Sequence, residues 1–544
     1  MTFHFFYDIL QIAKKKLNIG ANKRSNTVIM KKRIIALVLA VLMTTALCAC
    51  GGGKTEQAAP ETATPEAGST GEKLIGGEIT VGIAADLDTS LDPHVSSASA
   101  GTREVLFNIF EGLVKPDSDG NILPAIAESY SANETADVYT YILREGVQFH
   151  NGNTVKVGDV VYSLSRAAGL ETGEVLVSDV ANIAAVEATD DKTIVVTLKA
   201  ADTEFNSHMT VAIVPEGSDP NADVCGTGPF TFVSRTPQES IVLEKFEGYW
   251  GIPANLDKVT LKVIPDQQTM VMSLRSGAID LADKLPATQI SELSDLTIVQ
   301  GSSNIVQALY LNNAFEPFTD VRVRQALCYA IDKDMVIDLA SNGDGIAVGS
   351  SMYPAFGKYF MEELTYYYEP NAEKAKELLK EAGYENLSFT ITVPSNYTAH
   401  IDAAQVMVEQ LRAAGVEAKI ELVEWATWLE EVYRGRKFEA TVSGLDAHGL
   451  AASDMLARFQ SESSKNFVNF SSTEYDEAYA KAMSTTDEAE QTAYFKQCET
   501  ILTAEAANVY IQDAAIFAVM QNDIAGYEHY PLYVMDLASV YRIG

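Results

Sequence analysis

Cysteine, histidine and tryptophan are scarce in this sequence, which holds 5 Cys, 7 His and 3 Trp among 544 residues. Cys48 and Cys50 lie close together near the start, whereas Cys225, Cys328 and Cys498 are far apart. Three separated thiols cannot all pair with one another, and their spacing is not that of a zinc site. The sequence therefore predicts buried free thiols in the body of the protein, with no metal centre and no cofactor.

Positive charge is also in short supply. The chain has 40 Lys and Arg against 74 Asp and Glu, which gives a formal net charge of −34 at pH 7. Such an excess repels nucleic acid and anionic lipid headgroups and favours a solvated surface. We therefore expect no nucleic-acid partner. The length is too great for one small core, so two or three lobes are expected.

The apolar stretch near the start is too short to span a bilayer as a stable helix. Ile34–Leu47 runs for fourteen residues without a charge and follows the basic cluster Lys31–Arg33. This length suits the apolar part of an export signal. The stretch ends in Leu47-Cys48-Ala49-Cys50, which resembles a bacterial lipobox whose last cysteine accepts diacylglycerol. An ordinary secretion signal that happens to contain cysteines is the alternative.

The lipobox interpretation divides the start of the chain into three parts. We expect Met30 to be the true start, with 1–29 an extension of the gene prediction and 30–49 a signal peptide. Lipidation at Cys50 would then tether the protein to the outer face of a membrane, because two or three buried acyl chains anchor firmly. Residues 50–74 are rich in Gly, Ala, Pro, Thr and Glu and are expected to form a flexible tether.

The rest of the chain mixes strand and helix patterns irregularly, which predicts α/β or α+β lobes. Period-two alternation and helix-capping residues mark the expected elements. Strands are expected at 79–83, 139–143, 193–198, 241–246, 259–263, 305–312 and 419–423, with two short strands near Val509 and Phe517. Helices are expected at 98–110, from 159, at 320–339, 371–383, 400–414, 425–432, 475–483 and 488–505.

Six stretches in order resemble the extracytoplasmic solute-binding proteins of ABC importers, in the peptide/nickel-binding family 5. They are Ser90-Leu91-Asp92-Pro93-His94; Phe110-Glu111-Gly112-Leu113; Phe149-His150-Asn151-Gly152 with 159–163; Gly226-Thr227-Gly228-Pro229-Phe230 with Tyr249-Trp250; 320–327; and 371–384. The resemblance implies a periplasmic-binding-protein-like type II fold, with two lobes around a cleft and an extra domain. It places lobe I at 75–107, 205–305 and 508–544, domain II at 108–204, and lobe III at 306–507.

The resemblance also implies where the ligand binds. The cleft wall after the Leu-Asp-Pro turn corresponds to Ser96, Ser97 and Ser99. Peptide binders of the family carry a Trp-x-x-Asp pattern whose carboxylate pairs with the peptide amine. At the matching stretch, 444–448, the Trp position is Leu and the Asp position is His448, while Asp446 lies two residues earlier. The position where some oligopeptide binders carry an arginine for the peptide carboxylate corresponds to Val442. The two charge anchors are therefore not both in their usual places, and the substrate stays open.

Further ligand contacts are expected on lobe III and on the last segment that crosses between the lobes. His400 falls where the family sometimes presents a ligand-facing side chain. Trp425 and Trp428 lie three apart on one helical face, so we expect one to pack in the core and the other to line the cleft. The remaining candidates are Tyr310, Asn312 and Asp513.

These observations favour a non-enzymatic, lipid-anchored, monomeric receptor that captures an oligopeptide-like solute by hinge closure and delivers it to ABC permease and ATPase subunits. A receptor for a nickel or other metal chelate, or for an oligosaccharide, is the alternative within this class. A surface-anchored hydrolase and a sensor or extracellular chaperone are alternatives from other classes. The hydrolase is disfavoured because no Gly-x-Ser-x-Gly or His-Glu-x-x-His motif is present.

Overall fold

The computed structural model describes residues 71–95, 99–447, 450–531 and 533–544. The predicted signal and Cys50 lie outside the described residues, as do Ser96, Ser97 and His448. Among the described residues, no helix has both the length and the apolar character needed to cross a membrane.

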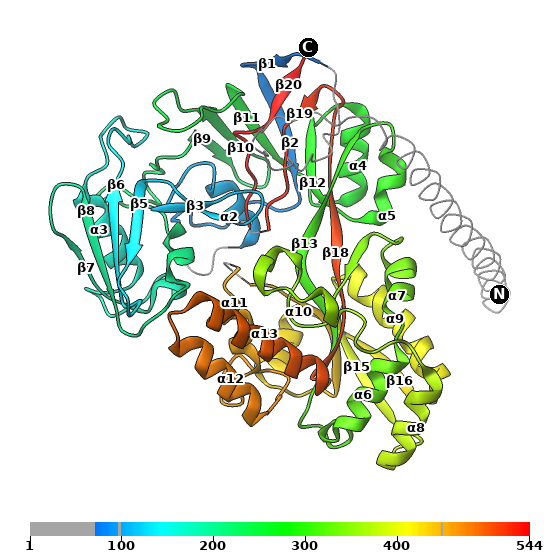
Figure 1. The fold of residues 1–544 in the computed structure, drawn as a ribbon. Coiled ribbons are helices and arrows are strands. Elements are labelled where there is room, and N and C mark those ends of the chain that lie inside the picture. Colours follow the sequence, from blue (N-terminus) through cyan, green and yellow to red (C-terminus); the bar gives the residue numbers. More distant parts are fainter. Residues whose placement is uncertain (1–70, 96–98, 448–449, 532) are drawn as a thin grey trace, which may run out of the picture. The chain divides into compact units, whose positions relative to one another are not determined.

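Eleven of the described strands form one mixed sheet, in the order β16-β15-β17-β13-β18-β12-β2-β11-β10-β9, with β14 beside β18. Two of these strands are long and pair antiparallel along most of their length (Figure 1). They are β13 (Thr297–Leu311) and β18 (Asn508–Met520). The other nine are β2 (Glu78–Ile83), β9 (Phe230–Thr236), β10 (Ser240–Lys245), β11 (Lys258–Val263), β12 (Leu281–Leu285), β14 (Gly345–Ala347), β15 (Ser388–Pro394), β16 (Glu417–Val423) and β17 (Ala440–Leu445).

Strands β13 and β18 belong to both lobes. In lobe I they extend the sheet through β12 and β2, and in lobe III they extend it through β17 and β15. Their side chains alternate between two buried faces within lobe III. Tyr310 and Tyr510 enter one core, whereas Leu311 and Val509 enter the other. A strand covered on both faces must be apolar on both, which explains the apolar stretches Ala308–Leu311 in β13 and Val509–Ile511 in β18.

Helices cover the two faces of the lobe III sheet. The set comprises α6 (Val321–Ala330), α7 (Lys333–Ala340), α8 (Ala372–Ala382), α9 (Thr398–Ala413), α10 (Trp425–Thr427), α11 (Ala452–Leu456), α12 (Thr473–Ser484) and α13 (Glu488–Ala504). Asp320 and Asn371 cap α6 and α8 as predicted, and Gly383 ends α8 with φ +83°. Lobe I carries α2 (Ala100–Leu106), α4 (Gln267–Ser276) and α5 (Ala287–Ile290).

Three element predictions are wrong. The expected helix at 320–339 is two helices, because Ile331 leaves the helical conformation and Asp332 starts α7 by accepting a hydrogen bond from the Met335 N–H at 3.1 Å. The helix expected at 425–432 is a short α-helical turn that continues as a π-helical turn over Trp428–Arg434. The two short strands near Val509 and Phe517 are one continuous strand, β18.

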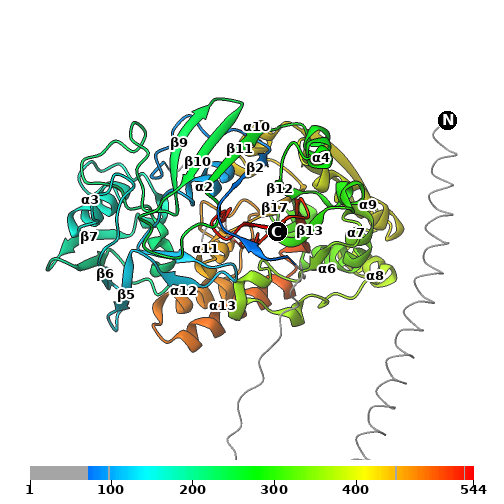
Figure 2. The same cartoon turned by 90° about the horizontal axis from the view of Figure 1, so that it is seen from above.

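Domain II has its own sheet, which Figures 1 and 2 place on the opposite side of the fold from α6–α9. Its strand order is β5-β6-β8-β7, for Ala127–Ala132, Val138–Leu143, Thr193–Leu198 and Ile183–Ala188. Helix α3 (Val157–Ala167) packs on this sheet, and the short pair β3 (Val114–Pro116) and β4 (Ile122–Pro124) lies beside it. The core extends beyond the predicted boundary at residue 204, since it includes Phe205, Met209 and Cys225.

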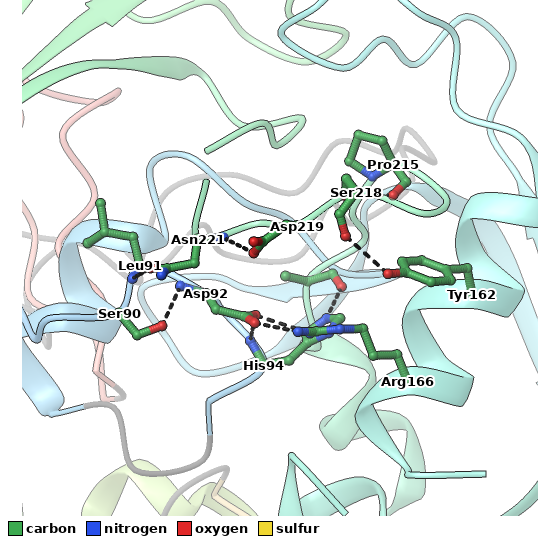
Figure 3. Close-up of polar contacts among 11 residues, drawn as sticks. Ser90, Leu91, Asp92, His94, Tyr162, Arg166, Pro215, Ser218, Asp219 and Asn221 are labelled. Atoms are coloured by element: carbon green, nitrogen blue, oxygen red, sulfur yellow. Dashed lines mark hydrogen bonds and ion pairs between the residues drawn. The ribbon is translucent and has the colours of Figure 1, made fainter. Parts of the chain in front are cut away.

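A buried polar cluster fastens α3 of domain II to the Leu-Asp-Pro turn of lobe I (Figure 3). The Arg166 guanidinium pairs with the Asp92 carboxylate and donates to His94 Nδ1 at 2.8 Å. His94 Nε2 lies 2.7 Å from the Ala212 carbonyl oxygen. Because Nδ1 accepts, the ring is neutral with its proton on Nε2, and burial lowers its pKa. The matching motif at 90–94 is thus a structural junction.

Cys225, Cys328 and Cys498 are free and buried, which confirms the prediction from their spacing. Burial raises the pKa of the Cys328 thiol to about 12, so this thiol stays protonated and unreactive at neutral pH.

Candidate ligand-binding cleft

The paired strands β13 and β18 are interrupted where they cross between the lobes. Their register breaks between Ser302 and Val306, and Asn304 adopts φ +57° within the break. The Asp513 carboxylate fills the gap, accepting hydrogen bonds from Ser303 Oγ at 2.8 Å, from the Ile305 N–H at 3.3 Å and from Ser302 Oγ. Asp513 is 1% exposed, and burial raises its pKa. Its carboxylate holds the break together from within the fold.

A second register break lies on the neighbouring strand β12. Pairing with β18 shifts between Ala282 and Leu285, and Lys284 adopts φ +59° there. Bulges of this kind redirect side chains and are common beside binding sites. Both breaks border the same cavity, so the sheet supplies cavity-lining groups where its regular pairing stops.

The cavity between the lobes, here called the inter-lobe cavity, holds about 140 Å³. Lobe I contributes Lys284, Tyr530 and Tyr533, and lobe III contributes Asp446 and Ala447. The remaining lining residues are Ser302, Ser303, Asn304, Ile305, Ile516 and Pro531. Residues from both predicted lobes therefore face one partly open cavity.

A second and larger cavity lies where lobe I meets domain II. This junction cavity holds about 240 Å³, and Tyr533 lines it as well as the inter-lobe cavity. Its other lining residues are Pro93, Val95, Arg103, Leu106, Phe107, Phe110, Glu111, Gly112, Val114, Lys115, Pro116, Val177, Ser178, Asp179, Thr210, Val211, Ala212 and Val534.

Opposite charges face each other around Tyr533. The Arg103 guanidinium lies 4.4 Å from the centre of the Tyr533 ring, and Lys284 Nζ lies 5.9 Å from it. Burial lowers the pKa of Arg103, an effect that Asp446 and Asp179 oppose. Lys284 forms an ion pair with Glu104, whose pKa is raised by burial. Two cations from lobe I thus lie on the side of the cleft that faces Asp446.

Lobe III fixes the position of Asp446 through its backbone. Arg458 Nη2 donates to the Asp446 carbonyl oxygen at 2.9 Å, and its other terminal nitrogen lies 3.4 Å from the Tyr433 hydroxyl oxygen. The side chain of Asp446 remains part-exposed and lines the cavity. This arrangement leaves an acidic group held in place and open to a ligand.

Several predicted contacts have structural roles that close them to a ligand in this structure. Tyr310 is 1% exposed, and its hydroxyl donates to the Val306 carbonyl at 2.6 Å. Asn312 is buried, and its amide donates to the Phe438 carbonyl at 2.7 Å. Trp428 is buried, and its Nε1 donates to Thr441 Oγ1 at 2.9 Å. The polar groups of these residues, like the Asp513 carboxylate, are engaged within the fold, and their role as ligand contacts stays a prediction.

The other predicted residues lie nearer the surface but outside the lining of both cavities. Trp425 is half-buried and stacks on Trp428 at 5.0 Å between ring centres. His400 Nδ1 accepts from Gln307 Nε2 at 2.9 Å, and burial lowers its pKa to about 4. Ser99 caps α2 by accepting from the Thr102 N–H at 3.4 Å. Among the predicted contacts that the structure describes, Asp446 lines the inter-lobe cavity.

Sequence reasoning missed Arg103, Lys284, Tyr530 and Tyr533. They come from a helix, a strand break and the C-terminal segment, and no spacing in the sequence links these places. Within the described residues, no group of three or more His, Cys, Asp or Glu side chains is arranged to hold a metal ion.

Comparison with known proteins places the chain in a family. Residues 121–467 match the family described as bacterial extracellular solute-binding proteins, family 5. The chain is 28% identical over 549 residues to the dipeptide-binding protein DppE of Bacillus subtilis, covering 93% of this chain and 98% of that protein. It is also 28% identical over 466 residues to the glutathione-binding protein GsiB of Pectobacterium atrosepticum, covering 81% and 89% of the two chains.

The fold agrees with this assignment. The structure of the periplasmic binding protein DppA of Helicobacter pylori in complex with the peptide STSA matches with a TM-score of 0.70 and 26% identity, covering 87% of this chain and 99% of that one. The expected α/β fold of the type II periplasmic binding proteins is confirmed. The family match spans more than half of the chain, so this protein belongs to the bacterial extracellular solute-binding proteins of family 5.

Proposed function

We propose that this protein is the lipid-anchored receptor of an ABC importer and that it captures short peptides in the inter-lobe cavity. The observation that carries the proposal is the placement of opposite charges at that cavity. Asp446 of lobe III and Lys284 of lobe I line it, and the Arg103 guanidinium lies against the ring of Tyr533, which also lines it. A peptide with free ends has a matching ammonium and carboxylate. The ligands named for DppE, GsiB and DppA, a dipeptide, glutathione and STSA, support this class.

Recognition follows from charge-assisted hydrogen bonds in a partly enclosed space. The peptide ammonium binds the Asp446 carboxylate, and the peptide carboxylate lies toward Lys284 and Arg103. Each of these protein charges already has a neighbour of opposite sign, so ligand binding replaces one charge contact by another and leaves no charge unpaired. Binding groups on both lobes give the ligand a preference for the closed form, which is what a permease can detect.

The register breaks in β13 and β12 supply the hinge in this proposal. A break without regular ladder hydrogen bonds absorbs a change in backbone angles at lower cost than an intact ladder. The Cys50 lipid anchor and the tether keep the receptor near its permease and ATPase partners outside the cytoplasm. No covalent step is involved, and the receptor acts as a monomer.

Calorimetric titration with short peptides tests the proposal. Ala-Ala-Ala should bind, and acetylating its amine should weaken binding by at least about tenfold, because the ammonium loses a charge-assisted contact. The variant Asp446→Asn should remove most of the difference between the two peptides. Asp191→Asn, at an exposed carboxylate in domain II, is the matched control.

Two results would overturn the proposal. One is a failure of all di- to tetrapeptides to bind while a metal chelate or an oligosaccharide binds. The other is equal binding of free and acetylated peptides, which would mean that Asp446 does not meet the amine.

A further inference from the structure

The junction cavity is larger than the cavity that holds the opposed charges, and its walls are mainly apolar. It holds about 240 Å³ against about 140 Å³ for the inter-lobe cavity. Val95, Leu106, Phe107 and Phe110 form one side, and Val177 of domain II faces it from another element. A ligand held by its charged ends needs little of this space for its main chain.

The two cavities meet at Tyr533. Its ring lines both, with the Arg103 guanidinium 4.4 Å from the ring centre. A peptide bound between Asp446 and the two cations therefore has the junction cavity within reach of a side chain. An aromatic side chain of the peptide would pack well against the Tyr533 ring.

Four charged residues line the junction cavity. Arg103 lies over the Tyr533 ring, Asp179 accepts a hydrogen bond from Ser178 Oγ at 3.0 Å, and Glu111 and Lys115 contact each other. Glu111 accepts hydrogen bonds from the Tyr249 hydroxyl and from Trp250 Nε1, both at 2.7 Å. Lys115 Nζ lies 3.6 Å from Glu111 and 3.2 Å from the Tyr249 hydroxyl. A charged ligand side chain would lose its hydration here and would have to compete for these groups. The chemistry of the wall favours an uncharged, apolar guest.

The volume sets the size of that guest. An apolar cavity of roughly 150 Å³ accommodates a benzene molecule. The junction cavity exceeds this volume, so a phenylalanine or tryptophan side chain fits. A methyl group would leave most of the space without contacts.

From these observations we propose that the junction cavity is a specificity pocket for one bulky apolar, preferably aromatic, side chain of the peptide ligand. The inference rests on the proposed peptide-receptor function and adds the class of peptide that this receptor selects. The pocket lies between lobe I and domain II, so domain II takes part in choosing the ligand.

The test is a calorimetric scan in which Phe replaces each residue of Ala-Ala-Ala in turn. One of the three peptides should bind at least about 30-fold more tightly than Ala-Ala-Ala, the order of gain expected for filling an apolar pocket. Lys or Glu at the same position should remove the gain. Val177→Trp, which fills the cavity from its half-buried rim, should abolish the preference for Phe while leaving the affinity for Ala-Ala-Ala within about threefold.

Val175→Trp is the matched control, because Val175 lies two residues away, is 41% exposed and does not line the cavity. A second variant, Val177→Ala, keeps the test independent of any strain from the larger residue and should retain the preference for Phe. Unfolding midpoints of all variants should stay close to that of the parent protein.

The outcomes separate the two proposals. If Ala-Ala-Ala binds but no Phe peptide binds more than about threefold tighter, the specificity pocket is refuted and the receptor function stands. If the preference for Phe survives in Val177→Trp, the side chain binds elsewhere and the inference is wrong. If no peptide binds to the folded protein, the proposed receptor function fails and the pocket fails with it.

Discussion

A contact between domain II and lobe III allows the closure of the cleft to be tested. The Glu204 carboxylate accepts hydrogen bonds from the Ala452 and Ser453 N–H groups at 3.0 and 2.9 Å. Those two residues follow the loop that carries Asp446. Beside this contact, the Gln491 amide of lobe III donates to Thr203 Oγ1. If lobe III swings away from lobe I and domain II, these hydrogen bonds break.

The expected effect of Glu204→Ala follows from these two hydrogen bonds. A hydrogen bond to a charged group contributes roughly 1.5–3 kcal/mol, and a neutral one about 1 kcal/mol. Burial raises the pKa of Glu204, so part of the gain from the ionised form is offset by desolvation. We therefore take about 2 kcal/mol for the pair, which shifts the balance between closed and open forms about 30-fold toward the open form.

Small-angle scattering and calorimetry measure this shift. Glu204→Ala should increase the radius of gyration of the ligand-free protein and weaken peptide binding by up to about 30-fold, because the ligand must then bring the lobes together unaided. Glu204→Gln keeps one acceptor oxygen and should lose no more than about fivefold. Glu187→Ala, an exposed carboxylate on β7, should change neither quantity. Unchanged scattering and affinity in Glu204→Ala would refute the idea that this contact stabilises the closed form.

Three further predictions concern the anchor, the strand break and acid stability. Cys50→Ala should release the protein from the cell surface into the medium, as followed by immunoblot of cell and medium fractions, whereas release by Cys48→Ala would contradict the lipobox assignment. Asp513→Ala should lower the free energy of unfolding by about 2 kcal/mol in urea titrations, because the part-buried Ile305 N–H and the Ser303 hydroxyl lose their acceptor. An unchanged midpoint would show that the break is stable without the carboxylate. Burial lowers the pKa of His94 below its usual value near 6.5, so on acidification the unfolded chain binds this proton first and the free energy of unfolding should fall as pH drops below about 6.5. His94→Gln should reduce the difference in thermal unfolding between pH 7.5 and 5. An unchanged difference would assign the pH dependence to other groups.

Features that depend on near neighbours in the chain could be predicted from the sequence. The Asp320 and Asn371 side chains accept the Arg322 and Lys374 N–H groups at 2.9 and 3.0 Å, within three residues of themselves. Capping of this kind depends on local chemistry. The two-lobed fold followed from the order of six family motifs. These motifs describe packing junctions such as the one that joins Asp92, His94 and Arg166, so they identify the fold without identifying the ligand.

The continuous strand β18 could not be predicted because its polar residues are satisfied from far away in the chain. Gln512 and Asp513 interrupt two apolar stretches, which suggested two short strands. In the fold, Gln512 Nε2 donates to Gln307 Oε1 at 2.8 Å, and Asp513 accepts from Ser303. These partners lie on β13, about two hundred residues earlier in the chain. A polar residue can be buried in a strand when such a partner exists, and sequence alone does not reveal the partner.

The candidate site was harder to predict for a related reason. Reading β13 as a regular strand selected Tyr310, which lies in the paired part of the strand, and Asn312, which directly follows its last residue. Both are buried. The residues that line the inter-lobe cavity come instead from positions where regularity fails, at Asn304 and Lys284 with positive φ. The periodicity of apolar residues identifies the buried faces of a regular strand. It carries no signal for a break, because a break is where the regular pairing stops. The groups that line the inter-lobe cavity are therefore found by following interrupted pairing in three dimensions, and Tyr533, which lines both cavities, likewise comes from an irregular segment.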